Sequence, residues 1–348
     1  MASTSNASSS LETTLTSAWQ RRGLLACALW PVSLLFRALS GLRVLLYRSG
    51  LKQSARMPVP VVVVGNIFIG GTGKTPLTIW LCGVLREAGF SPGVVSRGHG
   101  ASGAALRAVT SMSTPQEVGD EPLLIYLRSG CPVVVGRARA DAARALLALH
   151  PEVDILVSDD GLQHYALQRD VEIVLFDARA VGNGFLLPAG PLRESAARRR
   201  DFTVVNAPVL TDALRAAVGG QPYRMQLAGA LAEPLLRPGQ GVPLASLAGR
   251  RIVAAAGIGN PARFFAMLRG AGLSVGELAL PDHHDFLDRP FDGVDADIIL
   301  ITDKDAVKCR QLEHLKDDPR LWVVPVTAQL DGALAEHSVE KCRGSSPA

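Results

Sequence analysis

Residues 61–76 read VVVVGNIFIGGTGKTP, and the elements on either side follow from this stretch. Its first part, Val61–Val64, is a continuous run of β-branched residues, which is typical of a strand buried on both faces. Gly65–Gly73 is rich in glycine, and from Leu77 onward apolar residues recur at helical spacing. A strand, a glycine-rich loop and a helix in this order form the context in which a phosphate-binding loop is found.

The residue types of this loop suit the phosphates of a nucleotide. Glycines let backbone N–H groups approach phosphate oxygens, and the N-terminus of the following helix adds its positive dipole end. A lysine here reaches the β- and γ-phosphates, a threonine hydroxyl binds Mg²⁺, and proline suits the first turn of a helix. The predicted nucleotide-binding residues are Gly70, Gly71, Thr72, Gly73, Lys74, Thr75 and Pro76.

Two observations bear on whether this stretch is only a glycine-rich turn. The strict phosphate-loop pattern has glycine where this chain has Phe68, which is a departure. Against that, only six of the 36 Lys and Arg residues are lysines, so a lysine in this one position is unlikely to be incidental. The phosphate-binding interpretation is therefore favoured.

Strands and helices alternate along the rest of the chain, which predicts an α/β fold with a mostly parallel sheet. The further strand candidates of the first part are Val94–Ser96, Pro132–Val135, Ile155–Val157 and Glu172–Phe176, with a helix at Ala138–Leu149. Prolines and glycines cluster near 208–224, and a second, smaller α/β lobe follows. Its expected elements are the strands Ile252–Ala255, Ile298–Ile301 and Trp322–Val326 and the helix Ala262–Gly270. We predict three parts, residues 1–56, 57–221 and 222–348.

Composition excludes several classes of protein. With 348 residues, 48% hydrophobic and 20% charged, the chain is globular and long enough for about two domains. The net charge of +4 is too weak and too spread out to argue for nucleic-acid binding. The five cysteines are widely spaced and form no C-x-x-C, so we expect neither a disulfide framework nor a zinc finger, but reduced thiols in a cytosolic compartment.

The N-terminal region predicts an amphipathic helix. Residues 24–36 are uncharged and mostly apolar, but thirteen residues are too few to span a bilayer, which needs about 20. Beyond them one helical face carries Leu35, Leu39, Leu42 and Leu46, and the opposite face carries arginines. Such a helix either lies in a membrane interface or packs on the domain, and the sequence leaves both open. The polar ends, residues 1–18 and 333–348, are expected to be loose.

Carboxylates follow the strand that ends near residue 157. The motif Asp159-Asp160-Gly161-Leu162-Gln163-His164 places two aspartates at the carboxyl end of a predicted parallel strand, where they could hold Mg²⁺ or its waters. A plain acidic turn is the alternative. Spacing alone does not divide the roles of the two aspartates.

Four other polar segments stay ambiguous when each is considered alone. Val118–Pro122 is an ordinary acidic turn before a helix. Pro281–Phe286 contains paired histidines and aspartates, which suit metal ligands, a base with its orienting partner, or a solvated loop. In Pro188–Glu194, Arg193 could face a phosphate and Glu194 a metal. Thr302–Lys308 follows a strand and starts like a capped helix, yet it holds two of the six lysines.

These segments, in this order, resemble the tetraacyldisaccharide 4'-kinases of lipid A biosynthesis. The matching stretches are Val64–Pro76, Ser96–Gly98, Val118–Pro122, Ser158–His164, Pro188–Glu194, Asp282–His283 and Thr302–Lys308. The ordered set is specific, whereas one phosphate loop is weak evidence. His99 stands where the family is expected to have tyrosine, which puts only a local contact in doubt.

The resemblance implies a reaction and a place in the cell. The expected reaction is transfer of the γ-phosphate of ATP to the 4'-hydroxyl of an acylated glucosamine disaccharide 1-phosphate, which gives lipid IVA. It implies a P-loop NTPase-like parallel sheet flanked by helices, a second smaller α/β lobe, and an active site in the cleft between the lobes. The N-terminal helix is expected to dock on the cytoplasmic face of the inner membrane. Nucleic acid and an obligate protein partner are not expected.

The resemblance also implies roles for individual residues. Asp120 falls where the family places a catalytic base and His283 where it places the partner that orients this base. A carboxylate held by an imidazole can accept the proton of a sugar hydroxyl as phosphorus is attacked. Lys74 and Arg193 are the other expected catalytic residues, and Arg139 is a less securely aligned phosphate contact. The metal and nucleotide region is expected to include Thr75, Asp159, Asp160, Gln163, His164 and Glu194.

A membrane-associated positioning ATPase with a phosphate-binding loop is the alternative function. Such ATPases usually carry a second lysine just before the glycines. Here that region reads Asn66-Ile67-Phe68-Ile69, without lysine. The kinase is therefore the favoured interpretation.

Overall fold

The computed structural model describes residues 18–98 and 105–344, which divide into two compact units. Unit 1 comprises residues 1–74, 160–225 and 330–348, and unit 2 comprises residues 75–159 and 226–329. The sequence-based expectations for residues 1–17 and for His99 lie outside the described residues. The domain boundaries inferred from the sequence, at residues 57 and 222, stay a prediction.

Unit 1 contains a parallel sheet whose strands run in the order β8, β7, β6, β1. Its elements are α2 (Leu24–Arg48), β1 (Val61–Asn66), β6 (Val171–Asp177), β7 (Phe202–Asn206), α7 (Asp212–Val218), the first part of β8 (Tyr223–Ala228) and α10 (Gly332–Arg343). The register pairs Val62 with Val171 and Val174 with Thr203. All six residues of β1 are buried, as the β-branched run predicts.

Two segments of unit 1 are more ordered than the sequence indicated. The Pro- and Gly-rich break at 208–224 contains α7, whose first turn is capped by the Thr211 side chain. The segment 333–348 was expected to be loose, and this expectation is wrong for its larger part, because α10 covers Gly332–Arg343. Leu334, Ser338 and Cys342 recur every four residues and are buried, a stripe that the polar composition of the segment hid.

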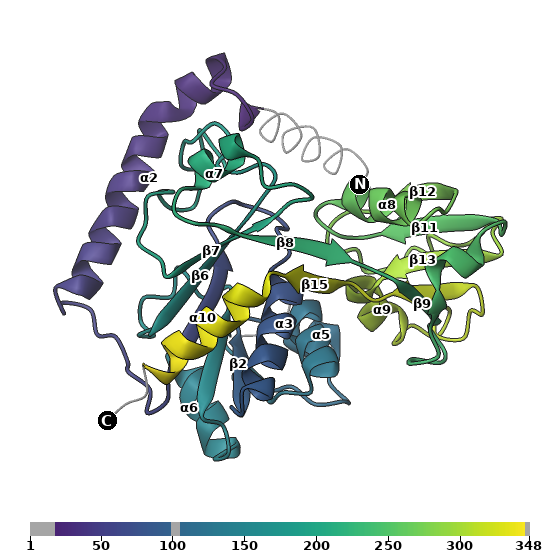
Figure 1. Ribbon diagram of the computed structural model, residues 1–348, viewed down its shortest axis with the longest axis horizontal. Helices are drawn as coiled ribbons and strands as arrows, with labels where there is room; N and C mark the ends of the chain where they lie inside the picture. The colour runs from purple at the N-terminus through teal and green to yellow at the C-terminus, as the bar shows by residue number, and fades with distance from the viewer. Residues whose placement is uncertain (1–17, 99–104, 345–348) are drawn as a thin grey trace. The chain divides into compact units, whose positions relative to one another are not determined.

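The helix α2, purple in Figure 1, is continuous over 25 residues and includes Pro31 in its interior. The thirteen apolar residues 24–36 are therefore only the first part of a longer helix. By length and composition alone, α2 is long and apolar enough to cross a membrane. The exposed fractions of Leu35, Leu39 and Leu42 are 60%, 59% and 51%, so this leucine face does not pack on the described residues.

The first part of unit 2 contains strands in the order β5, β2, β4, β3, parallel except for the antiparallel pair β3 and β4. Its elements are α3 (Lys74–Glu87), β2 (Pro92–Ser96), β3 (Arg107–Ala108), α4 (Pro115–Val118), α5 (Asp120–Ser129), β4 (Val133–Val135), α6 (Arg139–Leu149) and β5 (Ile155–Asp159). Each strand and helix predicted for residues 77–157 is present. The mostly parallel α/β fold predicted from the sequence is confirmed.

The second part of unit 2 contains a sheet in which β12, β11, β13 and β14 are parallel and β9 and β10 are antiparallel. The elements of this part are β9 (Leu231–Pro234), β10 (Val242–Pro243), a 3₁₀ turn (Leu244–Leu247), β11 (Ile252–Ala256), α8 (Pro261–Gly270), β12 (Val275–Ala279), β13 (Ile298–Thr302), α9 (Asp303–Cys309), β14 (Leu321–Val324) and β15 (Thr327–Leu330), of which β15 is not a strand of this sheet. The helices α8 and α9 cover opposite faces of this sheet (Figure 1). Ala254 packs with the α8 core and Ala255 with the α9 core, as alternation along a strand requires.

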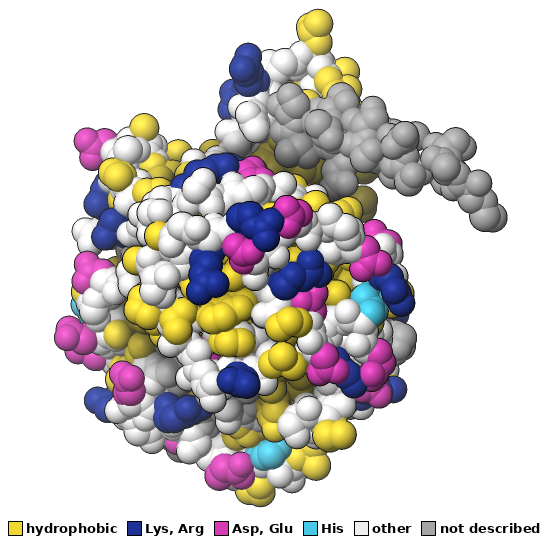
Figure 2. Space-filling view, turned by 90° about the vertical axis from the view of Figure 1, so that its right-hand side faces the viewer, with side chains coloured by type: hydrophobic (Ala, Val, Ile, Leu, Met, Phe, Trp, Pro, Cys, Tyr) yellow, Lys and Arg dark blue, Asp and Glu magenta, His cyan; other side chains and the backbone are white. Residues whose placement is uncertain are grey.

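Charged side chains of both signs are distributed over the surface. In Figure 2, Lys and Arg side chains alternate with Asp and Glu side chains across the visible face, and apolar side chains lie between them. This mixed pattern agrees with the small net charge of +4. The single-sign field that would steer a strongly charged polymer is not what this face presents.

Candidate active site

The glycine-rich loop after β1 is shaped by two asparagines. Asn66, the last residue of β1, donates from Nδ2 to the carbonyl oxygens of Phe68 (2.6 Å) and Gly70 (3.2 Å). Its Oδ1 accepts a hydrogen bond of 3.2 Å from Lys74 Nζ. At the end of β7, Asn206 Nδ2 donates to the carbonyl of Thr72 over 2.9 Å. Neither asparagine has a role predicted from the sequence, because contacts with backbone carbonyls are not revealed by spacing.

Phe68, the departure from the strict loop pattern, is an anchor. Its side chain is buried, and the Arg179 guanidinium lies 4.2 Å from the centre of its ring. The positions of the loop that require glycine are Gly70 and Gly73. Their φ angles of 97° and 101° lie in a region that residues with a side chain rarely adopt. Glycine is therefore needed at these two positions, and an apolar residue is accommodated at position 68.

Lys74, Asp160 and Arg193 lie together in unit 1. Lys74 Nζ is 3.8 Å from one carboxylate oxygen of Asp160, and Arg193 Nη1 is 3.3 Å from the other. The backbone N–H of Arg193 donates to the carbonyl of Ile67 over 2.7 Å, which ties the Arg193 loop to the glycine-rich loop. Sequence analysis placed these three side chains in one region, and the structure brings them together.

Gln163 and Glu194 also meet in unit 1. Gln163 Nε2 donates to Glu194 Oε1 over 3.1 Å, and Arg198 donates to Glu194 Oε2 over 2.6 Å. Arg198 in turn pairs with Glu172 at 2.6 Å. Both oxygens of Glu194 therefore take part in hydrogen bonds within the chain.

The acidic motif is fitted closely against β1. A Cβ atom built on Gly65 would lie 2.7 Å from Leu162 Cγ, a distance that real Cβ atoms essentially never show. The N–H of Gly161 donates to the carbonyl of Val64 over 3.3 Å. The absence of a side chain at position 65 thus lets the acidic motif approach the strand that carries the phosphate loop.

Thr75 and Asp159 belong to unit 2. Asp159 is 1% exposed, and its two carboxylate oxygens accept hydrogen bonds from Thr78 Oγ1 (3.2 Å) and Ser96 Oγ (3.3 Å). Arg139 is buried and donates to the carbonyl of Asp159 over 3.2 Å and to that of Gly136 over 2.9 Å. Its guanidinium thus holds backbone at the end of β5. Hydroxyl and carboxylate oxygens are the ligands that Mg²⁺ prefers, so the donor types at Thr75 and Asp159 fit this ion.

Asp120 and His283 form a hydrogen-bonded pair across 163 residues of sequence. Asp120 is the first residue of α5, after Gly119 with φ of 90°, and it is 5% exposed. His283 Nδ1 lies 3.0 Å from Asp120 Oδ2, and because a carboxylate only accepts, the imidazole N–H donates. Asp120 Oδ1 accepts from the N–H of Glu121 over 2.9 Å. Of the three interpretations of residues 281–286, this geometry favours a base with its orienting partner.

The electrostatic surroundings shift the pKa values of both members of this pair, in opposite directions. Burial raises the pKa of Asp120, but the hydrogen bond from His283 and the charges of Lys304, His283 and Lys308 outweigh it, so the pKa lies below its ordinary value. The hydrogen bond to Asp120 raises the pKa of His283, against burial and the Lys304 charge. The two groups interact strongly, so they titrate as a pair.

Two lysines of α9 face the pair. Thr302 caps α9 by accepting from the N–H of Asp305, which confirms the capped helix predicted from the sequence. Lys304 Nζ lies 3.9 Å from Asp120 Oδ2, 3.1 Å from Glu121 and 3.4 Å from Asp282. Both lysines of α9 are among the six lysines of the chain, and the sequence alone predicts no function for them.

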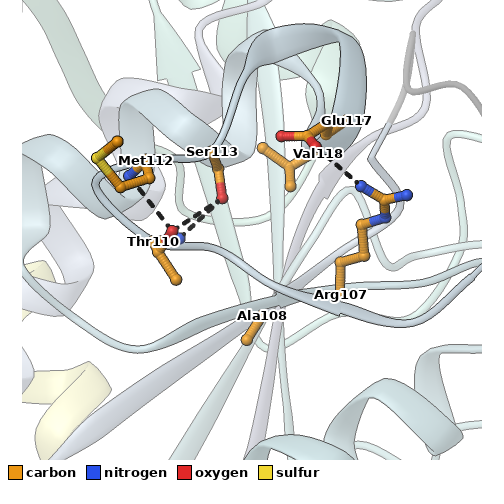
Figure 3. A pocket seen from close by; sticks show the side chains of 7 residues that line it. All are labelled: Arg107, Ala108, Thr110, Met112, Ser113, Glu117 and Val118. Atoms are coloured by element: carbon orange, nitrogen blue, oxygen red, sulfur yellow. Dashed lines mark hydrogen bonds and ion pairs between the residues drawn. The ribbon is translucent and has the colours of Figure 1, made fainter.

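A polar hollow of about 410 Å³ lies beside the segment that leads to Asp120. Figure 3 shows its lining, which comprises Arg107, Ala108, Thr110, Met112, Ser113, Glu117 and Val118. Arg107 pairs with Glu117 at 3.3 Å, and Thr110 and Ser113 hydrogen-bond to each other. Polar side chains that line this hollow thus form ion pairs and hydrogen bonds with one another.

The side chains near residues 281–286 that could bind a metal are not those of the Asp120–His283 pair. Ligand atoms of His284, Asp285 and Asp288 lie within 4.8 Å of one another, and both aspartates are exposed. His284 also pairs with Asp288 at 3.4 Å. Exposed acidic groups are common without an ion, so this cluster receives no role.

Comparisons with known proteins agree on one family. The sequence profile of the family described as tetraacyldisaccharide-1-P 4'-kinase matches residues 25–342. A tetraacyldisaccharide 4'-kinase of Janthinobacterium sp. (strain Marseille) is 62% identical over 347 residues, which cover 97% of this chain and 98% of that protein. A protein of the same description from Herminiimonas arsenicoxydans is 58% identical over 351 residues and covers 97% and 98%. The crystal structure of an "apo" form of LpxK from Aquifex aeolicus in complex with ATP is 27% identical, with a TM-score of 0.74 over 91% of this chain and 99% of that one.

Proposed function

The chain belongs to the tetraacyldisaccharide-1-P 4'-kinase family, and from this premise we propose how its residues carry out the reaction. It is a tetraacyldisaccharide 4'-kinase of lipid A biosynthesis, and it binds ATP. Membership of this family excludes a positioning ATPase, the alternative that the phosphate loop alone left open. In the proposed reaction the γ-phosphate of ATP passes to the 4'-hydroxyl of the tetraacylated glucosamine disaccharide 1-phosphate, and lipid IVA is formed.

The hydrogen bond between Asp120 and His283 is the observation that carries the proposed mechanism. A sugar hydroxyl is a poor nucleophile, so its proton must be accepted as the oxygen attacks phosphorus. Asp120 is buried yet keeps a pKa below the ordinary value, so its carboxylate is available at neutral pH. His283 fixes the carboxylate through Oδ2 and thereby directs it. We assign Asp120 as the base and His283 as its orienting partner.

The glycine-rich loop and two cations would handle the phosphates. Backbone N–H groups of Gly70 to Thr75 and the N-terminus of α3 suit the β- and γ-phosphates. Lys74 and Arg193 lie on either side of Asp160, within 3.8 Å and 3.3 Å of its carboxylate. Both cations are thus held in place before nucleotide binds, and this preorganisation is what stabilises charge on a transferring phosphoryl group.

The residues that would hold Mg²⁺ are Thr75, Asp159, Asp160, Gln163 and Glu194. All of them offer oxygen donors, which this ion prefers. A bound Mg²⁺ would supply positive charge that stabilises the transferring phosphoryl group. In this chain, Thr78 and Ser96 orient the Asp159 carboxylate, while Gln163 and Arg198 orient Glu194.

We also propose that α2 attaches the enzyme to the cytoplasmic face of the inner membrane, where its acylated substrate lies. The leucine face of α2, namely Leu35, Leu39, Leu42 and the half-buried Leu46, is mostly exposed to solvent. Its inner side is fixed to unit 1, because Ser33 Oγ donates to the carbonyl of Leu186 over 2.7 Å and Arg43 donates to that of Gln163 over 3.3 Å. An exposed apolar face on a fixed helix suits the lipid interface.

The decisive experiment follows the phosphate. The protein is incubated with γ-labelled ATP, Mg²⁺ and the tetraacylated disaccharide 1-phosphate in mixed micelles. The lipid product is then separated, and its mass is measured by mass spectrometry. We expect one added phosphate on the lipid, none with a 4'-deoxy acceptor, and none after chelation of divalent ions. Release of free phosphate without a phosphorylated lipid would contradict the proposed transfer.

A further inference from the structure

Lys308 is a buried lysine that the mechanism above does not use. Its side chain is 8% exposed, and Nζ lies 3.9 Å from Asp120 Oδ2 and 3.5 Å from Asp305 Oδ1. On another side Nζ lies 5.3 Å from the centre of the Phe286 ring. Among the described residues, no atom forms a regular hydrogen bond with this ammonium group. A buried charge is costly unless it is compensated, so its two carboxylate neighbours account for its presence.

Asp305 connects Lys308 to the loop that carries His283. Its side chain is fully buried, and Oδ2 accepts hydrogen bonds from the N–H of Gly257 (3.0 Å) and from Thr302 Oγ1 (2.7 Å). The carbonyl of Gly257 accepts from the N–H of His283 over 3.2 Å. A Cβ atom on Gly257 would lie 2.9 Å from Asp305 Oδ1, so this approach requires glycine. Lys308 is therefore fixed to the same framework that places His283 beside Asp120.

We propose that Lys308 is a positioning residue for the Asp120–His283 pair, and that its buried charge holds the Asp120 carboxylate in the unprotonated form that accepts the proton of the acceptor hydroxyl. The inference rests on the proposed role of Asp120 as the base. It acts through Asp120 and does not require Lys308 to touch either substrate. The 3.9 Å separation and the low exposure of both groups make this a direct electrostatic effect with little screening.

Lys304 is at the same distance from Asp120, but its charge is shared. It also pairs with Glu121 and Asp282, at 3.1 Å and 3.4 Å, whereas Lys308 pairs only with Asp120 and Asp305 among the described residues. Removing Lys304 would release two further carboxylates, whereas removing Lys308 releases only Asp305, whose Oδ2 still accepts from Gly257 N–H and Thr302 Oγ1. The charged groups that surround Asp120 are His283, Lys304, Lys308, Glu121, Asp282 and Asp305.

The sign of the effect follows without assigning the proton to one member of the pair. A positive charge disfavours protonation of a nearby carboxylate and of a nearby imidazole alike. Loss of the Lys308 charge must therefore raise both apparent pKa values of the coupled pair. The acid limb of the pH profile of kcat/KM reports the apparent pKa below which the base is protonated and the enzyme is inactive. This limb should therefore move to higher pH.

The test compares Lys308→Met with wild type in a pH profile of phosphate transfer to the disaccharide lipid. Methionine keeps the length and apolar packing over Phe286 but removes the charge. We expect the acid limb to rise by about one pH unit, with kcat/KM on the plateau within about threefold of wild type. Lys308→Arg should keep the limb near its wild-type position. Lys316→Met is the matched control, because Lys316 is a half-buried lysine of unit 2 that pairs only with Glu313 among the described residues.

An unmoved acid limb in folded, active Lys308→Met would overturn the inference, and so would equal loss of rate at every pH. If the variant is too slow to profile, the imidazole titration of His283 is followed by NMR, with assignment from the spectrum of His283→Ala. We expect the His283 titration to rise in Lys308→Met, and an unchanged titration would again overturn the inference. Failure of the proposed function is a separate result, since wild-type protein would then not phosphorylate the lipid at all.

Discussion

Asp120→Asn and His283→Ala should behave as changes to one unit. Asparagine keeps the shape of Asp120 and can still accept the 3.0 Å hydrogen bond from His283, but it no longer accepts a proton. Loss of a general base lowers the rate by roughly 10²–10⁴. This corresponds to about 3–5 kcal/mol of transition-state stabilisation, at 1.36 kcal/mol for each tenfold change. ATP affinity should be unchanged, since the nucleotide contacts proposed here lie elsewhere.

The expected loss in His283→Ala is smaller. Removing the imidazole deletes one hydrogen bond to a charged group, which contributes about 1.5–3 kcal/mol. If all of that is expressed in the transition state, kcat falls by roughly 10- to 150-fold. In the Asp120→Asn background the imidazole has no base to orient. A second substitution there should therefore cost less than about threefold, far short of the product of the two single losses.

The assay is the initial rate of labelled phosphate transfer at saturating ATP and lipid for wild type, both single variants and the double variant. His150→Ala serves as the control for loss of an imidazole, because His150 is a surface residue that pairs with Glu152. Circular dichroism melts confirm that each variant is folded. Losses that multiply in the double variant would refute the reasoning, because they would show that the two side chains act independently.

Further predictions concern the phosphate loop, pH and the membrane. Lys74→Ala should lower kcat by at least about a hundred- to thousandfold, as for loss of one preorganised donor, and near wild-type turnover would contradict the loop assignment. The pKa of His283 is raised, so the shift of this imidazole contributes stability that is fully present below its unfolded pKa of about 6.5 and is lost as pH rises through the folded value. The Tm deficit of His283→Ala should therefore be larger at pH 6 than at pH 9, and an equal deficit would refute the linkage. Leu39→Glu with Leu42→Glu should release the folded protein from anionic vesicles in a sedimentation assay, and unchanged binding would remove α2 as the anchor.

The sequence predicted the elements that depend on apolar pattern. Continuous runs such as Val61–Val64 and Ile298–Ile301 are buried strands, because parallel strands covered on both faces need apolar residues at every position. The pattern did not predict α10, whose buried stripe contains Ser338 and lies among charged residues. It also divided α2 into an apolar half and an amphipathic half, although helical hydrogen bonding continues through both.

For the candidate site, the roles assigned to individual residues stay predictions, and the structure shows only which of the predicted side chains lie together. Nothing in the spacing of Asp120 and His283 indicates a hydrogen bond, since 163 residues separate them and the fold alone closes that gap. Only the resemblance to a family suggested the pair. The contacts of Asn66 and Asn206 with backbone carbonyls, and the burial of Lys308 beside Asp120, depend on the fold and have no signal in the sequence.

The close fit of Leu162 against Gly65 links two motifs in their evolution. Because the leucine occupies the space where a side chain at position 65 would stand, the two positions share one fixed volume. An alanine at position 65 could become fixed in a lineage only together with a smaller residue at position 162. Drift in the strand that carries the phosphate loop is thus coupled to drift in the acidic motif. Grafting a strand that carries a side chain at position 65 should fail unless a smaller residue is introduced at position 162 with it.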